Sequence, residues 1–182
     1  MTSESIRIDA QLCLEPIAPS HTRPLYELIE ADREDLRRWL IWIDETPDEA
    51  TMATALQRMA DNRAAGREAV FCIVWEGKPA GVISLHAISA IQRRAEIGYW
   101  LARCARGRGL ATRAARALIE YGFEQLGLHR VAILCAEENL ASRAVPERLG
   151  LTAEATLQDY FLHHGQFHNA IVYAIIAPRR TP

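Results

Sequence analysis

Residues Arg106-Gly107-Arg108-Gly109-Leu110-Ala111 join a strand-like run, residues 95–101, to a helix-like run, residues 112–123. Glycine has no Cβ, so its backbone N–H group can approach an anion closely. The first N–H groups of a helix lack internal partners, and the helix dipole favours negative charge beside them. Arg106 and Arg108 add positive charge next to the two glycines. The stretch therefore predicts a loop that binds a pyrophosphate.

The spacing of these glycines excludes two common nucleotide-binding motifs. A Rossmann fingerprint needs a third glycine where this chain has Thr112, and a P-loop needs a lysine directly after its last glycine. Arg-x-x-Gly-x-Ala at residues 106–111 resembles instead the (Gln/Arg)-x-x-Gly-x-(Gly/Ala) signature of the GCN5-related N-acetyltransferases (GNAT). This resemblance implies that the coenzyme acetyl-CoA is bound through its pyrophosphate by Arg106, Gly107, Arg108, Gly109, Leu110 and Ala111.

Length and composition predict one folded domain over residues 1–182, with residues 179–182 as a loose tail. The net charge of -2, from 21 basic and 23 acidic residues, argues against a general nucleic-acid-binding surface. The N-terminal residues carry no signal-peptide pattern, and the longest apolar runs, about ten residues, are too short to span a bilayer. We expect a cytoplasmic protein that binds neither nucleic acid nor membrane.

The spacing of apolar residues predicts a mixed α/β domain. After the glycine loop, Leu110, Ala114 and Leu118 recur at helical spacing and would face a sheet. Ser20 is expected to cap the first helix. The predicted strands are residues 12–17, 70–75, 80–85, 96–101, 130–135, 153–162 and 169–177, and the predicted helices are residues 21–32, 33–42, 47–64, 109–125 and 141–149.

Four further segments resemble the RimJ/RimL-type branch of the GNAT family, and the likeness covers residues 10–177. They are Ala95–Leu101, Leu36–Trp42, Gly165–His168, and Glu138–Ser142 together with the later Leu149-Gly150-Leu151. The resemblance implies a GNAT fold, in which a twisted and mostly antiparallel sheet of about six or seven strands is flanked by helices. The strands of that fold splay apart at the acetyl-CoA cleft.

The resemblance also implies the reaction, in which an amine attacks the thioester of acetyl-CoA directly through a tetrahedral intermediate. Main-chain groups near Trp100 and Leu101 would pair with the pantetheine arm. Asn139 would hydrogen-bond to the same region, and Ser142 would donate a proton to the departing sulfur. Alternatively, Asn139 is only a helix cap and Ser142 a surface serine.

The acceptor amine is implied by the same likeness. The tract from Gly81 to Trp100 is similar to the ribosomal-protein-serine acetyltransferases, which implies a protein N-terminus as the acceptor. The family likeness also implies a homodimer. A small-molecule amine is one alternative acceptor. A non-catalytic acyl-CoA-binding module is the alternative to an enzyme.

The general base is open between several candidates. Glu96 shares one strand face with Trp100, and a partly desolvated glutamate in the cleft would suit a base for an amine. The alternatives are that Glu96 only forms a salt bridge to a residue such as Arg94, that Asp159 is the base, or that a water chain serves. Family members often carry His-Asp where this chain has His168-Asn169.

Aromatic residues are expected to wall the acceptor channel, although tryptophans in such patterns are more often part of the core. The four candidates are Trp39, Trp42, Tyr160 and Phe161. The last two stand where related enzymes often have a glutamate, which puts a transferred base assignment in doubt.

No metal site is predicted from the sequence. The histidines at 163, 164 and 168 crowd one turn, but Gly165 lies among them and no carboxylate or cysteine completes a ligand set. The four cysteines form no CxxC pair and are read as reduced thiols. Of these, Cys135 would come near the coenzyme sulfur.

Overall fold

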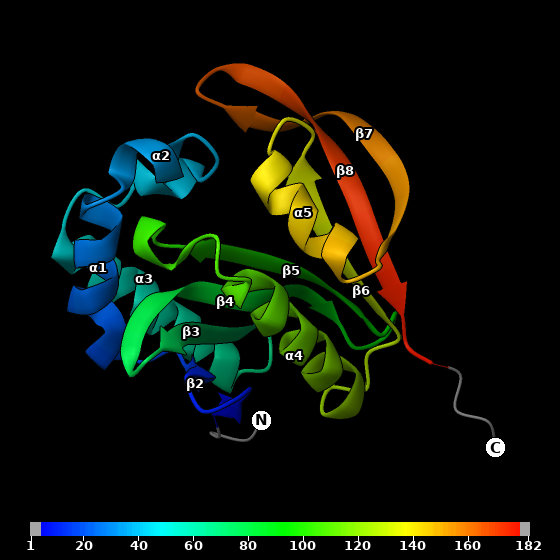
Figure 1. Ribbon diagram of the computed structural model, residues 1–182, viewed down its shortest axis with the longest axis horizontal. Helices are drawn as coiled ribbons and strands as arrows, with labels where there is room; N and C mark the ends of the chain where they lie inside the picture. The colour runs from blue at the N-terminus through cyan, green and yellow to red at the C-terminus, as the bar shows by residue number, and fades with distance from the viewer. Residues whose placement is uncertain (1–4, 179–182) are drawn as a thin grey trace.

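The computed structural model describes residues 5–178, which form one eight-stranded sheet with helices on both faces (Figure 1). The strand order is β1-β2-β3-β4-β5-β6-β8-β7, and only β5 and β6 are parallel neighbours. The predicted mixed α/β, mostly antiparallel sheet is confirmed, with eight strands instead of about six or seven. The strands are β1 (Ile6–Arg7), β2 (Leu12–Pro16), β3 (Ala69–Trp75), β4 (Lys78–Ser89), β5 (Arg94–Leu101), β6 (Arg130–Ala136), β7 (Thr152–His163) and β8 (Gln166–Ile176). The helices are α1 (Thr22–Glu30), α2 (Arg33–Arg37), α3 (Glu49–Ala64), α4 (Leu110–Glu124) and α5 (Leu140–Arg148). The described residues also form three 3-10 turns, η1 (Pro19–His21), η2 (Ile41–Ile43) and η3 (Arg103–Ala105).

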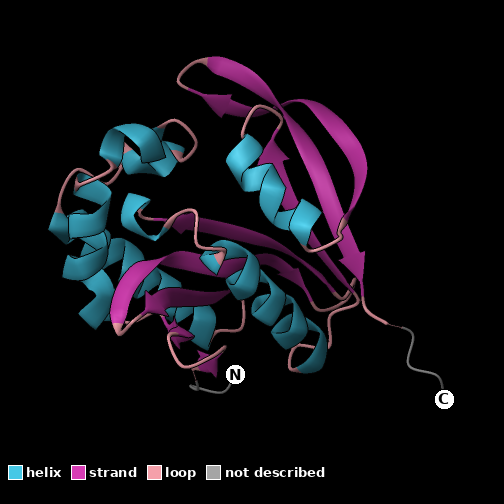
Figure 2. Cartoon of the chain, viewed as in Figure 1, coloured by secondary structure: helices cyan, strands magenta, loops and turns pink. Residues whose placement is uncertain are grey.

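Alternate residues of the central strands supply two hydrophobic cores on opposite faces of the sheet. On one face Phe71, Ile83 and Ile97 are buried with apolar residues of α4 and α5. On the other face Cys72 and Trp100 are buried with apolar residues of α1 and α3. Figure 2 shows α4 and α5 on the near side of the sheet, with α3 behind it. The two faces of the sheet are therefore covered by different helices.

The sheet opens between its two parallel strands. β5 and β6 pair only as far as Ile97 and Ile133. Beyond that pair, Gly98–Leu101 remains bonded to β4 and Leu134–Ala136 to β8, each on its outer side alone. Within residues 5–178 the main-chain groups that face the gap have no strand partner, so an extended molecule can add there as a further strand. The predicted splayed cleft is present.

The structure departs from the predicted elements at three places. The two-residue β1 is too short to leave a pattern in the sequence. The predicted helix over 33–42 ends at Arg37, because the Arg33 guanidinium donates to the Ile43 and Thr46 carbonyls and turns the chain into η2. Ser20 lies inside η1 and does not cap α1, whose N-cap is His21.

Two further expectations concern the ends of the chain and the membrane. The predicted tail, 179–182, lies outside the described residues. No helix within residues 5–178 is long and apolar enough to cross a bilayer.

Candidate active site

A cavity of about 1130 Å³ extends from the gap between β5 and β6 to the start of α4 at one end and to the β7–β8 hairpin at the other. Most of the predicted site residues line it. These are Trp39, Glu96, Trp100, Leu101, Arg106, Gly107, Gly109, Leu110, Ala111, Asn139, Ser142, Tyr160 and Phe161. Arg108 and Trp42 are not among the lining residues.

The glycine loop presents free main-chain donors to this cavity. Gly107 and Gly109 have φ values of 75° and 71°, a left-handed conformation that other residues adopt only with strain. A Cβ on either glycine would meet nothing within 4 Å, so the space beside both is open. None of the N–H groups from Gly107 to Thr112 donates to an acceptor within residues 5–178. This end of the cavity fits a pyrophosphate, for which such N–H groups are suitable donors.

The two arginines of the loop are engaged by protein partners. Arg106 pairs with the carboxylate of Asp32, whose side chain is only 2% exposed, and its Nε donates to the Leu101 carbonyl at 3.0 Å. The Arg108 guanidinium lies over the Trp75 ring, 4.7 Å from its centroid. Both side chains thus help to hold the loop in shape, and Arg106 also lines the cavity, so direct contact of the two arginines with the pyrophosphate stays a prediction.

A hydroxyl and thiol cluster lies on the face of β5 and β6 that carries α4 and α5. Tyr99 Oη donates to the Ser142 carbonyl at 2.9 Å and lies 3.2 Å from Ser142 Oγ. Cys135 Sγ is 3.3 Å from the same Oγ. Burial raises the pKa of both the Tyr99 phenol and the Cys135 thiol, so all three groups carry protons at neutral pH. The Tyr99 side chain is a site residue that the sequence pattern did not identify.

Asn139 is the N-cap of α5, and its Oδ1 accepts a hydrogen bond of 3.1 Å from Ser142 N. The helix-cap alternative is thus realised, although Asn139 also lines the cavity. Ser142 is partly buried, which excludes the alternative of a plain surface serine. The cap fixes the first turn of α5 and with it the direction of the Ser142 side chain.

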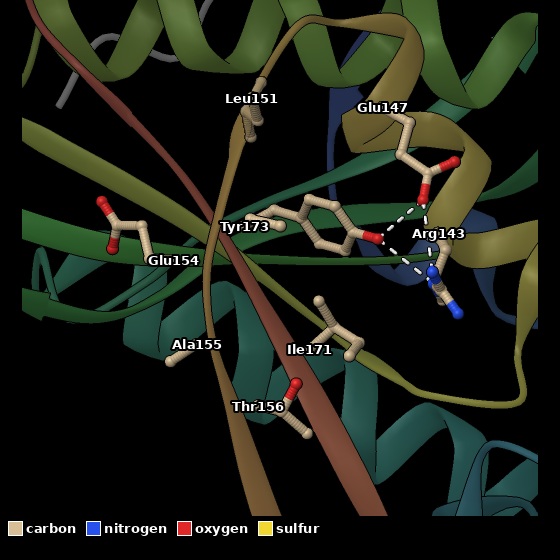
Figure 3. A pocket seen from close by; sticks show the side chains of 9 residues that line it. Arg143, Glu147, Leu151, Glu154, Ala155, Thr156, Ile171 and Tyr173 are labelled. Carbon is tan, nitrogen blue, oxygen red and sulfur yellow. Dashed lines mark hydrogen bonds and ion pairs between the residues drawn. The ribbon is translucent and has the colours of Figure 1, made fainter.

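A second, smaller cavity of about 550 Å³ lies between α5 and the β7–β8 pair (Figure 3). Here Tyr173 Oη donates to Glu147 at 2.7 Å and accepts from Arg143 Nε at 3.1 Å. Tyr173 belongs to β8 and the other two residues to α5, so this network fastens the helix to the sheet. Because Arg143 follows Ser142 directly, the same network holds the hydroxyl at the gap.

The end of the cavity beneath the β7–β8 hairpin has aromatic walls. Trp39 packs edge-on against His168, and Phe161 stacks on His163 with ring centroids 5.6 Å apart. Trp42 packs against Trp100 at 6.3 Å between ring centroids and belongs to a hydrophobic core. Three of the four predicted aromatics, Trp39, Tyr160 and Phe161, therefore line this cavity, and their contact with the acceptor stays a prediction.

Of the two candidate general bases, Glu96 and Asp159, the fold places only Glu96 at the cavity. Glu96 lines the cavity and lies 3.7 Å from His86 Nε2, a residue that the sequence pattern did not single out. Within residues 5–178 no ion pair joins Glu96 to Arg94, contrary to that alternative. Asp159 lies in a bulge of β7 with a φ of 50°, is exposed, and does not line the cavity.

The crowded histidines occupy different environments. His163 is buried, which lowers its pKa, while His164 Nε2 donates to the Arg37 carbonyl at 2.8 Å. In the described part of the chain no group of three or more His, Cys, Asp or Glu side chains is placed to hold a metal ion.

Comparisons with known proteins agree with this geometry. The acetyltransferase (GNAT) domain family matches residues 11–152. YdaF of Bacillus subtilis, provisionally named a ribosomal N-acetyltransferase, is 34% identical over 93% of both chains. The ribosomal-protein-serine acetyltransferase of Escherichia coli is 30% identical over 96% of this chain and 97% of its own.

A solved structure of RimL, a ribosomal L7/L12 α-N-protein acetyltransferase, aligns with a TM-score of 0.92 at 27% identity. The alignment covers 95% of this chain and 98% of that one. In that complex coenzyme A is disulfide-linked to a cysteine of RimL. The glycine loop at the start of α4, the splayed strands and these relatives agree: the chain belongs to the GNAT acetyltransferase family, in its RimJ/RimL-type branch, and is an acetyl-CoA-dependent N-acetyltransferase.

Proposed function

We propose that this enzyme acetylates the N-terminal α-amine of a protein. One observation carries the proposal: a single cavity connects the free N–H groups at the start of α4 with the Ser142 hydroxyl and with an aromatic-walled end under the β7–β8 hairpin. A chain terminus can enter such an end while the coenzyme occupies the other. The names of the two curated relatives support a ribosomal protein as the acceptor.

The chain's own groups would divide the work along the cavity. The N–H groups from Gly107 to Thr112 would bind the pyrophosphate, and the unpaired edge of Gly98–Leu101 would bind the pantetheine arm. The Ser142 hydroxyl would give a proton to the departing thiolate. Tyr99 supports this role, because its own O–H is donated to the Ser142 carbonyl and leaves the Ser142 proton free to turn. A main-chain N–H in the same edge would stabilise the oxyanion.

Trp39, Tyr160 and Phe161 would form the walls around the first residues of the acceptor. Trp42 would act behind Trp100 as its packing partner and not touch the acceptor. We assign residues 1–182 to one acetyltransferase domain that works in the cytoplasm without nucleic acid or membrane. By family likeness we also infer a homodimer, which sedimentation velocity would test.

Acceptor choice can be tested by incubating the purified enzyme with acetyl-CoA and measuring the free thiol released. Peptides that begin with Ser or Ala should be acetylated, whereas the same peptides with a blocked N-terminus should release no thiol. Spermidine is included as a small amine. Turnover of spermidine but of no peptide would overturn the N-terminal assignment, and coenzyme binding without any turnover would indicate a binding module.

A further inference from the structure

His86 and Glu96 stand opposite each other on neighbouring strands and both line the cavity. They are register partners of β4 and β5, and His86 Nε2 lies 3.7 Å from Glu96 Oε2. Their side chains are 42% and 39% exposed, so both are open to a ligand in the cavity. A carboxylate beside an imidazole can orient the ring toward a substrate.

The backbone around His86 is adapted to this arrangement. A Cβ on Gly98 would lie 3.2 Å from His86 Cε1, a tight contact that would require the imidazole to shift, so the ring packs closely against the main chain at Gly98. Directly after His86 the pairing of β4 with β5 is broken by a bulge, in which Ala87 adopts a φ of 49°. Bulges and left-handed residues other than glycine concentrate at functional sites, where they redirect a side chain.

The pair also lies on the opposite side of the sheet from the proton donor. Glu96 shares its strand face with Trp100, which packs with α1 and α3, whereas Tyr99 projects toward α5 and Ser142. Net transfer requires one proton to leave the amine nitrogen and one to reach the sulfur. The His86–Glu96 pair on one side of the gap can therefore take the proton from the amine nitrogen, while Ser142 on the other side gives a proton to the sulfur.

We propose that His86 is the general base that takes the proton from the acceptor amine, and that Glu96 is its positioning residue. In the step, the amine nitrogen forms a bond to the thioester carbon while neutral His86 accepts the N–H proton. The carbonyl electrons, which moved to oxygen on attack, then re-form the C=O bond as the C–S bond breaks, and the sulfur takes the proton of Ser142. Ser142 regains a proton from solvent, and His86 releases its proton to solvent. This inference rests on the proposed function, because it requires an amine acceptor in the aromatic-walled end.

The test measures acetylation of a Ser-starting peptide by wild type, His86→Ala and Glu96→Gln. Removal of a general base lowers the rate by roughly 100-fold or more, and we expect that loss in kcat for His86→Ala, with coenzyme affinity unchanged. Glu96→Gln should lower kcat by about 10-fold without raising the KM for acetyl-CoA. His129→Ala, at an exposed histidine outside the cavity, is the matched control and should keep full activity.

Rescue by free imidazole distinguishes a catalytic role of His86 from a structural one. Added imidazole should restore part of the His86→Ala activity and leave Glu96→Gln unchanged, a result that a loss of folding would not produce. If Glu96→Gln loses more activity than His86→Ala, or if imidazole rescues neither variant, His86 is not the base. If the wild type acetylates no α-amine at all, the proposed function fails, which is a distinct outcome from an active His86→Ala enzyme.

Discussion

Gly109→Ala tests the pyrophosphate loop most directly. The substitution should both strain the backbone and weaken coenzyme binding, and a matched control can separate these two effects. Gly109 has a φ of 71°, so alanine should destabilise the fold by about 1–2 kcal/mol through backbone strain alone. The added Cβ would point into open space beside the free N–H groups, where the pyrophosphate is expected. Losing one charge-assisted hydrogen bond there corresponds to about 1.5–3 kcal/mol, or at least roughly tenfold in the dissociation constant.

Gly66→Ala is the matched control, since Gly66 also has a φ of 71° and open space at its Cβ position but lies outside the cavity. Urea unfolding should show similar losses of stability for both variants, while calorimetry with coenzyme A should show weaker binding only for Gly109→Ala. Equal coenzyme affinity in the two variants would refute the assignment of the loop. Gly109→Trp should abolish binding altogether.

Three further predictions follow from individual contacts. Ser142→Ala should lower kcat by roughly 10- to 100-fold with coenzyme affinity nearly unchanged in calorimetry; unaltered thiol release would remove Ser142 from the mechanism. Arg106→Met leaves the buried Asp32 carboxylate with Arg103 as its remaining partner, and urea unfolding should show a loss of about 1–3 kcal/mol. Burial raises the pKa of Cys72 from 9.0 to about 12, so the folded state holds this proton more tightly and stability falls as pH rises above the unfolded value. From about pH 8 to pH 10 the free energy of unfolding should fall by about 1.4 kcal/mol more than in Cys72→Ala, and equal pH dependence of the two proteins would contradict this.

The sequence predicted the cofactor end of the site because its signals are local. The conformation of residues 106–111 follows from glycine spacing and from the first turn of a helix, both of which involve neighbours in the chain. The continuous apolar runs of β3 and β6 and the alternation of buried residues in β5 likewise reflect the burial of each strand. Asn139 and Ser142 are three residues apart, so their relation as cap and capped residue is also local.

The protein partners of the loop arginines could not be predicted from local sequence. Arg106 opens the glycine-rich loop, a position that suggests phosphate contact, and it also pairs with Asp32, which lies 74 residues earlier in the chain. Trp42 and Trp39 look equivalent in the sequence, but the turn of η2 sends one into the core and leaves the other at the cavity. An aromatic side chain can lie in the core or line a binding cavity, and tertiary packing decides which of the two it does.

The sequence by itself determined the family and the order of most elements, and it predicted where the coenzyme loop lies, because these features depend on short-range spacing and periodic burial. The tertiary structure decided which proton-carrying groups meet: Tyr99 reaches Ser142 only across the gap between β5 and β6, and His86 faces Glu96 only through strand register. Contacts of this kind depend on how distant strands align, and no local pattern in the chain encodes that alignment.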